Sequence, residues 1–203
     1  MTVSINKLQM SSSSKDNQDK TEALAYHFKK IIELLGDDPQ REGLLKTPER
    51  AAKAMLFATQ GYGQNPQEVL TQAIFEDGGS RMVVVKDIEF YSFCEHHILP
   101  FFGKVSIGYI PDGKMVGLSK LARLVNVVAR RLQVQERLTA EVCDAVNKAL
   151  SAKGVIVVCK AEHLCMKMRG VEKQDSSTVT IHDTGLFSTD ATLRADFFES
   201  LKH

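Results

Sequence analysis

The chain has 203 residues, of which 43% are hydrophobic and 25% are charged, the composition of a globular protein with a sizeable core. Its 26 basic and 25 acidic residues leave a formal net charge of +1, so no global field favours nucleic acid or a membrane surface as partner. The N-terminus lacks the apolar segment of a signal peptide, and no apolar run approaches the ~18 residues of a membrane span. We therefore expect a cytoplasmic protein that binds neither nucleic acid nor membrane.

The N-terminal part of the chain reads as a tail followed by helices. Residues 1–19 are polar and aperiodic, which predicts a disordered tail. Apolar positions then recur at helical spacing over residues 20–35, before a glycine that ends the pattern. Thr47 and Asn65 each precede a proline, the signature of a helix start, so two more helices are expected there. Residues 20–80 thus form a predicted N-terminal helical region.

Residues 81–203 have a different pattern, in which β-branched runs alternate with amphipathic helices. This order predicts an α+β domain with an antiparallel sheet and helices on one face. A sheet of this kind has open edges that one protomer cannot easily cover, so we also expect a homo-oligomer. In chain order the sequence predicts strands over 82–91 and 103–110, helices over 119–128 and 138–149, strands over 154–168 and 176–181, and a final helix over 189–201.

A candidate metal site begins with Cys94 and His97, because the C-x-x-H spacing lets a thiolate and an imidazole face one ion from a single turn. Catalytic zinc sites keep only three protein ligands, so that water can hold the fourth position. Cys165 is the best candidate for the third ligand. If it lies in a strand, it shares a face with His163, two residues earlier.

The other cysteines and histidines leave alternatives open. Cys143 follows a helical pattern and Cys159 lies in an apolar run, so both are explained more simply as small buried hydrophobes. A disulfide through Cys165 is disfavoured in a cytosolic chain. His96 or His163 could instead complete a closed, structural site with four ligands. Two histidines beside three presumed ligands nevertheless favour catalysis, because a structural site needs no additional acid or base.

Several separate motifs follow one another along the chain. They are Cys94-Glu-His-His followed by Pro100-Phe-Phe-Gly-Lys, then Gly117-Leu-Ser-Lys120, Gln133-Val-Gln-Glu-Arg-Leu138 and His163-x-Cys165-x-x-x-Arg169-Gly170. In this order they resemble those of one enzyme family, GTP cyclohydrolase I, the zinc enzyme that opens pterin and folate biosynthesis. The resemblance runs from roughly Asp37 to the C-terminus. It implies the T-fold, in which sheets from five subunits close a barrel and two rings stack as a decamer with shared active sites.

Binding of the substrate, GTP, must use something other than a P-loop, since G-x-x-x-x-G-K-[ST] is absent. Ser119 and Lys120 at a helix start offer a hydroxyl, an ammonium and free backbone N–H groups to an anion. Glu136 is a candidate for guanine recognition, because a carboxylate can accept hydrogen bonds from the base's N1–H and exocyclic amine. Gln135 is a second candidate, as an aid to Glu136. The resemblance supports that role of Glu136 and assigns the triphosphate to Arg50, Ser119, Lys120, Arg123 and Arg169.

The implied reaction is hydrolysis of GTP at C8 of the purine, giving formate and 7,8-dihydroneopterin triphosphate. Zinc would be the cofactor, with His163 protonating N7 as the ring opens, His96 moving a further proton and Ser119 lying near the ribose. Two rival interpretations are another T-fold pterin enzyme, which would use three histidine ligands, and a non-enzymatic module stabilised by zinc. Production of a fluorescent pterin from GTP separates them.

Overall fold

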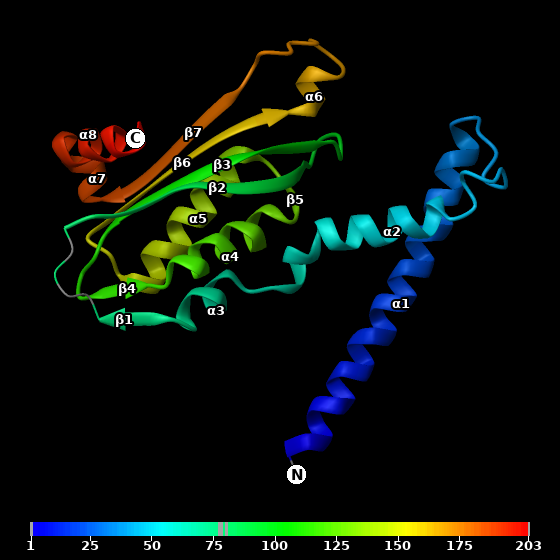
Figure 1. Ribbon diagram of the computed structural model, residues 1–203, viewed down its shortest axis with the longest axis horizontal. Coiled ribbons are helices and arrows are strands. Elements are labelled where there is room, and N and C mark those ends of the chain that lie inside the picture. The colour runs from blue at the N-terminus through cyan, green and yellow to red at the C-terminus, as the bar shows by residue number, and fades with distance from the viewer. Residues whose placement is uncertain (1, 77–78, 80, 203) are drawn as a thin grey trace. The chain divides into compact units, whose positions relative to one another are not determined.

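The computed structural model describes residues 2–76, 79 and 81–202, with side chains from residue 16 onward. The chain divides into two compact units, Met1–Phe57 and Ala58–His203 (Figure 1). This division differs from the expected boundary at residue 80. The short helices η1 (Gln60–Gly63) and α3 (Pro66–Thr71) belong to the second unit, where α3 packs against its two long helices.

The first unit contains α1 (Thr2–Leu34) and the bulk of α2 (Thr47–Ala58). Helix α1 ends where the sequence predicted, because Gly36 follows with a positive φ of 91° that favours glycine. The helix begins at Thr2, within the segment for which the sequence predicted a tail. An ion pair one turn apart, with Lys20 Nζ 2.6 Å from Asp16 Oδ2, supports the helix in this region. Met1 and the side chains before residue 16 lie outside the described part.

The second unit is built on a five-stranded sheet in the order β5-β2-β3-β6-β7. All neighbouring strands are antiparallel except β5, which runs parallel to β2. The predicted α+β class is thereby confirmed. The strands are β2 (Val83–Cys94), β3 (Pro100–Ile110), β5 (Leu132–Gln133), β6 (Gly154–His163) and β7 (Thr178–Gly185).

Helices α4 (Leu118–Ala129) and α5 (Gln135–Leu150) cover one face of this sheet (Figure 1). Strand side chains alternate between the two faces, and those on the covered face are apolar and buried. The main core therefore lies between the sheet and the two helices. It includes Val105, Ile107, Tyr109, Leu121, Leu124, Leu138, Val142, Val146, Val155 and Val157.

The expectation that helices lie on one face only needs a correction. Helices α7 (Leu186–Thr189) and α8 (Ala191–Ser200) follow β7, and Phe197 of α8 packs with Ile156 in a second, smaller core. Ile156 alternates with the residues of the main core along β6, so α8 lies on the opposite face. Gly108 allows this contact, because a Cβ there would approach a Phe197 ring carbon to 2.6 Å.

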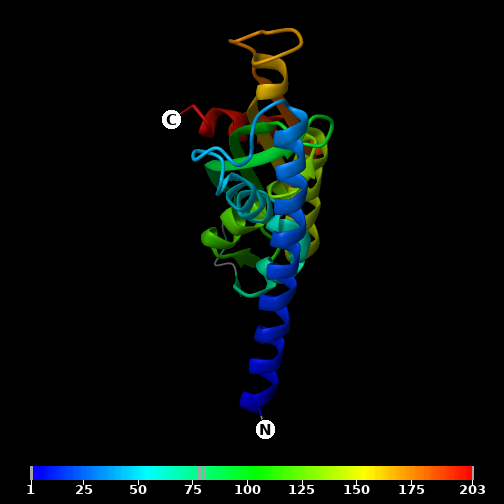
Figure 2. The ribbon, with the colours of Figure 1, turned by 90° about the vertical axis from the view of Figure 1, so that its right-hand side faces the viewer.

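The two ends of the sheet carry different connecting segments. At the Cys94 end, β2 turns into β3 and β6 passes into the short helix α6 (Leu164–Lys167). At the Gly154 end, β3 leads through β4 (Lys114–Val116) into α4, and β7 leads into α7. In Figures 1 and 2, α6 and the segment after it project past the Cys94 end. The sequence missed β4 and its partner β1 (Ile74–Glu76), since each is too short to show a period.

None of the helices in the described part of the chain combines the length and the apolar character that crossing a membrane requires.

Candidate active site

A tight turn after β2 brings Cys94 and His97 together. The Cys94 N–H donates to the Leu99 carbonyl at 2.9 Å, and the Ile98 N–H donates back to the Cys94 carbonyl at 2.8 Å. Ile98 takes a positive φ of 53°, an uncommon conformation for a β-branched residue. The turn is therefore held by its own backbone hydrogen bonds, and it places Cys94 Sγ 3.8 Å from His97 Nδ1.

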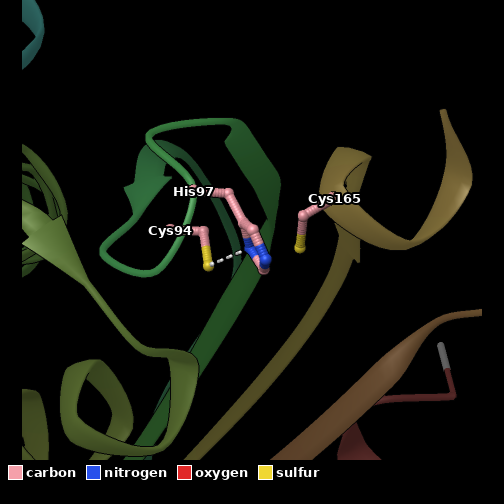
Figure 3. Close-up of side chains that lie close together, drawn as sticks. All are labelled: Cys94, His97 and Cys165. Atoms are coloured by element: carbon pink, nitrogen blue, oxygen red, sulfur yellow. Dashed lines mark hydrogen bonds between the residues drawn. The ribbon is translucent and has the colours of Figure 1, made fainter. Parts of the chain in front are cut away.

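Cys165 approaches these two side chains from α6, and Figure 3 shows the three facing one another. One ligand atom from each of Cys94, His97 and Cys165 lies within 4.8 Å of the other two. A sulfur and a nitrogen bound to one tetrahedral zinc ion would be about 3.6 Å apart, from the usual bond lengths. The 3.8 Å between Cys94 Sγ and His97 Nδ1 is close to that value, and Cys165 is within 4.8 Å of both, so these three side chains could hold a metal ion.

The position of Cys165 corrects one step of the sequence argument. Strand β6 ends at His163, and Cys165 lies in the short helix α6 and not on a strand face shared with His163. Burial, followed by the neighbouring Cys94 sulfur, raises the pKa of Cys165. Metal coordination acts in the opposite direction, because a bound cation favours the thiolate.

The two remaining cysteines behave as predicted. Cys143 and Cys159 are fully buried in the core. Burial raises the pKa of each thiol to about 12, so neither forms a thiolate at neutral pH. They are therefore packing residues, unlike the pair at the Cys94 end.

His163 lies beside the cluster at the end of β6. Its ring stacks on the Phe101 ring with centroids 4.7 Å apart and planes only 3° apart. Burial lowers the pKa of His163, and the charge of Glu136 opposes that shift. Glu136 follows Gln135, whose side chain contacts the imidazole, so its carboxylate lies at the same end of the sheet, at the exposed start of α5.

Gln135, which the sequence suggested as an aid to guanine recognition, lies inside the protein. Its side chain is 1% exposed, whereas a contact with the base requires an accessible group. Its Oε1 lies 2.8 Å from His163 Nε2, and its amide nitrogen donates to groups on β6 and β7. The side chain thus supports His163 from within the protein.

Other predicted residues lie near the cluster or far from it. His96 is exposed, and its Nδ1 is 3.7 Å from Cys94 Sγ. Arg169 is exposed just after α6, and its charge acts on Cys165 against the larger effects that raise the cysteine's pKa. Arg50 belongs to α2 in the first unit.

The predicted anion-binding residues of α4 belong to the other end of the sheet. Ser119 and Lys120 lie in the first turn of α4, which starts at the Gly154 end and finishes beside β5 at the Cys94 end. At a rise of 1.5 Å per residue, they lie about 15 Å from the end of α4 that is beside β5. The N-cap position of this helix is occupied by Gly117, so Ser119 lies inside the helix and is not its cap. Lys120 Nζ donates to Gln72 Oε1 at 2.7 Å, and Arg123 is exposed one turn further on.

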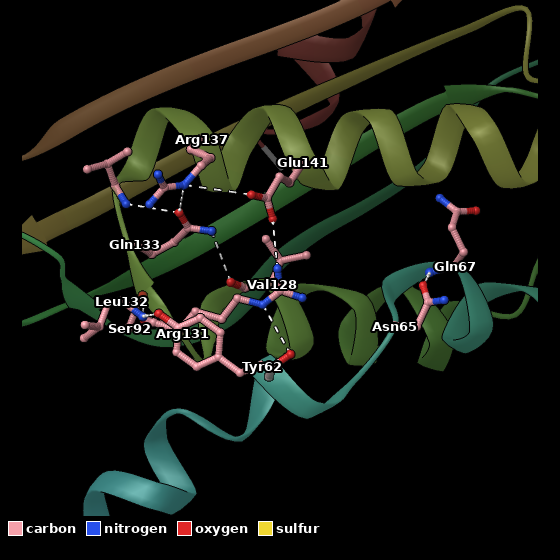
Figure 4. A network of polar contacts seen from close by, with 12 residues as sticks. Tyr62, Asn65, Gln67, Ser92, Val128, Arg131, Leu132, Gln133, Arg137 and Glu141 are labelled. Atoms are coloured by element: carbon pink, nitrogen blue, oxygen red, sulfur yellow. Dashed lines mark hydrogen bonds and ion pairs between the residues drawn. The ribbon is translucent and has the colours of Figure 1, made fainter.

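A polar network that the sequence did not reveal lies at the start of α5, and Figure 4 shows Gln133 between Arg137 and the Val128 carbonyl. Gln133 Oε1 accepts a hydrogen bond from Arg137 Nε at 2.6 Å, and Gln133 Nε2 donates to the Val128 carbonyl at 3.3 Å. Arg137 also pairs with Glu95, the residue after Cys94. The metal-ligand turn is thus tied to the start of α5, which carries Gln135 and Glu136. The signal in the sequence was the group of polar and charged residues at 133 and 135–137, which is easily mistaken for a solvated face.

On the other face of the sheet, a groove of about 540 Å³ is lined by Tyr91, Phe102 and Lys160, among others. None of the predicted site residues in the described chain lines it, so we do not assign the chemistry to this groove.

Taken together, the fold and the cluster define an α+β protein with a candidate metal centre beside a half-buried histidine and an exposed carboxylate. Comparison with known proteins goes further. The family model described as GTP cyclohydrolase I matches residues 24–202. The chain therefore belongs to the GTP cyclohydrolase I family of enzymes, as the motifs predicted.

Individual relatives agree. A protein named GTP cyclohydrolase 1 from Chlorobium chlorochromatii is 55% identical over 172 residues, which cover 85% of this chain and 77% of the relative. The protein of that name from Porphyromonas gingivalis is 53% identical over 182 residues, covering 90% and 94% of the two chains. Among solved structures, the archaeosine synthase QueF-Like in the apo form is 18% identical and covers 53% of this chain and 96% of its own, with a TM-score of 0.41. That likeness is too distant to bear on the fold.

Proposed function

We propose that this chain is a zinc-dependent GTP cyclohydrolase I, which converts GTP and water to formate and 7,8-dihydroneopterin triphosphate. One observation carries the proposal. In a member of this family, Cys94, His97 and Cys165 form a cluster able to hold a metal, and His163 and Glu136 lie at the same end of the sheet.

The ligand set favours zinc among the common metals, because thiolate and imidazole ligands suit it and three protein ligands leave a position for water. When bound, zinc lowers the pKa of a water molecule and so supplies a nucleophile near neutral pH. The remaining steps belong to side chains of this chain.

Glu136 would orient the base, since its exposed carboxylate can accept hydrogen bonds from the guanine N1–H and exocyclic amine. Adenine offers no such pair of donors, and a carboxylate left unpaired costs binding energy. His163 would donate a proton to N7 of the purine as the bond to C8 breaks, and His96 would move a second proton. The imidazole of histidine can both give up and accept a proton in such steps.

The triphosphate would be bound by Arg50, Ser119, Lys120, Arg123 and Arg169. Ser119 and Lys120 belong to the Gly154 end of the sheet, which supports an assembly in which the Gly154 end of one subunit meets the Cys94 end of another. We infer a homo-oligomer with shared sites, a decamer of two stacked rings. The exposed edge strand β7 supports sheet pairing between subunits.

The decisive experiment is incubation of the zinc-loaded protein with GTP, followed by oxidation and detection of a fluorescent pterin together with formate. We expect equal amounts of the two products. Zinc binding without either product would favour the non-enzymatic zinc module, and product formation that persists after complete removal of zinc would exclude the metal from the reaction.

A further inference from the structure

Gln135 is a buried polar side chain whose orientation follows from its neighbours. Its Nε2 lies 3.0 Å from the Cys159 carbonyl oxygen and 3.1 Å from the Thr178 carbonyl oxygen. It is also 3.1 Å from Thr180 Oγ1. Two of these three groups are carbonyls, which can only accept hydrogen bonds. A flipped amide would direct its own oxygen at both carbonyls, so the nitrogen must be the atom that faces them.

The other atom of the amide therefore faces His163 as an acceptor. Gln135 Oε1 is 2.8 Å from His163 Nε2, and an oxygen of this kind requires a hydrogen on the ring nitrogen. The neutral imidazole carries only one hydrogen. Its placement on Nε2 leaves the lone pair on Nδ1, for which no hydrogen-bond partner is found within residues 16–76, 79 and 81–202.

We propose that Gln135 is a positioning residue that fixes the neutral ring of His163 in the Nε2–H form and thereby makes Nδ1 the nitrogen that exchanges a proton with the substrate. This inference rests on the proposed function and names the atom that would perform its proton transfer. It also explains why Gln135 is polar although it is too buried to contact the base.

The Phe101 ring holds the imidazole in one orientation, and two threonines satisfy the polar groups around Gln135. The Phe101 ring lies parallel to it at 4.7 Å, which limits tilting. Thr139 Oγ1 lies 2.7 Å from the Gln135 carbonyl oxygen and 2.6 Å from Thr180 Oγ1. The hydroxyl of Thr180 can donate to Thr139, and the hydroxyl of Thr139 can donate to the backbone carbonyl of Gln135. Both hydroxyl hydrogens are then used, and Thr180 Oγ1 remains an acceptor for the side-chain amide of Gln135. The support of the glutamine is then internally satisfied.

The proton balance is simple. In its charged form the ring carries hydrogens on both nitrogens. Transfer of the Nδ1 proton to a purine nitrogen leaves a neutral ring with its remaining hydrogen on Nε2. The bond to Gln135 is therefore the same before and after the transfer, so the ring need not rotate between steps.

The first test needs no substrate. Nitrogen-15 NMR of the zinc-loaded wild-type protein at about pH 8.5, well above the ordinary histidine pKa of ~6.5, distinguishes protonated from unprotonated ring nitrogens. The His163 signals are identified by their loss in His163→Asn. We expect Nε2 to be protonated and Nδ1 to be unprotonated. The reverse pattern would overturn the proposal whether or not any variant folds.

The second test compares two substitutions in the same network. Gln135→Met removes the amide with little change of volume, so kcat should fall by about 10-fold or more, with KM changed less than about 3-fold and zinc content unchanged. Thr180→Val removes one acceptor but leaves both carbonyls to orient the amide. It should lower Tm yet keep the wild-type ring signals and kcat.

The outcomes separate this inference from the function beneath it. A folded Gln135→Met variant that holds zinc and retains wild-type kcat would overturn the inference with the proposed function intact. Absence of GTP turnover by the wild-type protein would overturn the proposed function instead. A Thr180→Val variant that loses kcat as strongly as Gln135→Met would also count against a specific role for the glutamine.

Discussion

The two ends of the sheet have the same construction and different chemistry. Both are made of strand ends and short connections under the helices α4 and α5. At the Cys94 end, metal ligands, a stacked histidine and a carboxylate converge within one chain. At the Gly154 end, Ser119 and Lys120 occupy the start of α4, while a second apolar core anchors α8. Under the proposed function, one end would carry the groups for bond breaking, and the other would carry groups for binding an anion.

The comparison teaches that a site can be complete in its reactive groups and incomplete in its binding groups. Helix α4 separates Ser119 and Lys120 from the Cys94 end by most of its length. A nucleotide triphosphate held by both ends would need the ends of two different chains. The following predictions test this division.

The strongest expected effect is loss of the metal at the Cys94 end. Cys165→Ser should lose zinc, and activity should fall by about 10³-fold or more, because water then keeps its high pKa. Metal content by mass spectrometry and GTP turnover measure the two losses. The matched control is Cys143→Ser. Its hydroxyl can still donate to the Val155 carbonyl, so the substitution should cost about 1 kcal/mol of stability and leave zinc and activity unchanged. Full zinc occupancy in Cys165→Ser would remove the proposed third ligand.

Base recognition at the Cys94 end is expected to give the next largest effect. Glu136→Gln keeps the shape but presents a donor where an acceptor is needed, so kcat/KM for GTP should fall by about 10²-fold while Tm stays near the wild-type value. The preference for GTP over other purine triphosphates should narrow. Asp144→Asn, further along the same helix, is the control and should change neither kcat/KM for GTP nor the preference for GTP. Wild-type kcat/KM in Glu136→Gln would show that guanine is recognised elsewhere.

Sharing of sites between chains can be tested by mixing two inactive variants, Arg50→Ala and His163→Ala. After random exchange at equal concentration, about one quarter of the sites should combine an intact His163 with an intact Arg50 from the neighbour. Activity should then return to about that fraction of the wild-type value. Mass-tagged chains verify the exchange. If exchange is complete and activity stays at zero, each site must be built within one chain.

The smallest effect is expected at the Gly154 end. Burial raises the pKa of Asp183, but hydrogen bonds from Ser188 and Arg194 outweigh it and hold the pKa below its usual value. A carboxyl with a lowered folded pKa stabilises the protein above its unfolded pKa of ~3.9, and that contribution is lost as pH falls through the folded value. Asp183→Asn should cost about 1 kcal/mol at pH 7 without changing kcat. The Tm difference from wild type should shrink toward pH 3, and a constant difference would contradict this assignment.

Local patterns predicted the elements that have a clear period or an unmistakable spacing. The apolar face of α4, the β-branched run of β2 and the C-x-x-H turn all carry their information within a few residues. The same is true of Asn65, whose side chain accepts a hydrogen bond from the Gln67 N–H at the start of α3. These features depend on backbone geometry and burial that neighbouring residues decide.

Features that depend on distant partners escaped the sequence. The end of β6 at His163 is marked by no proline or glycine, so the strand was expected to continue through Cys165. Gln135 reads as an exposed residue at a helix start, but its hydrogen-bond partners lie 24 to 45 residues away. Strand β5 has only two residues. Such contacts arise from tertiary packing, which overrides local preference.

The hydrogen-bonded turn at residues 94–99 bears on how a zinc ion would bind to the candidate centre and be released from it. Because the backbone of this turn is already fixed by the bonds between Cys94, Ile98 and Leu99, ordering it requires little help from a metal. A zinc finger, in contrast, gains its fold from the ion. Here zinc release should be a local, reversible event: a chelator would empty the centre while the sheet stays folded, and cobalt could then enter as a coloured reporter of the same ligands.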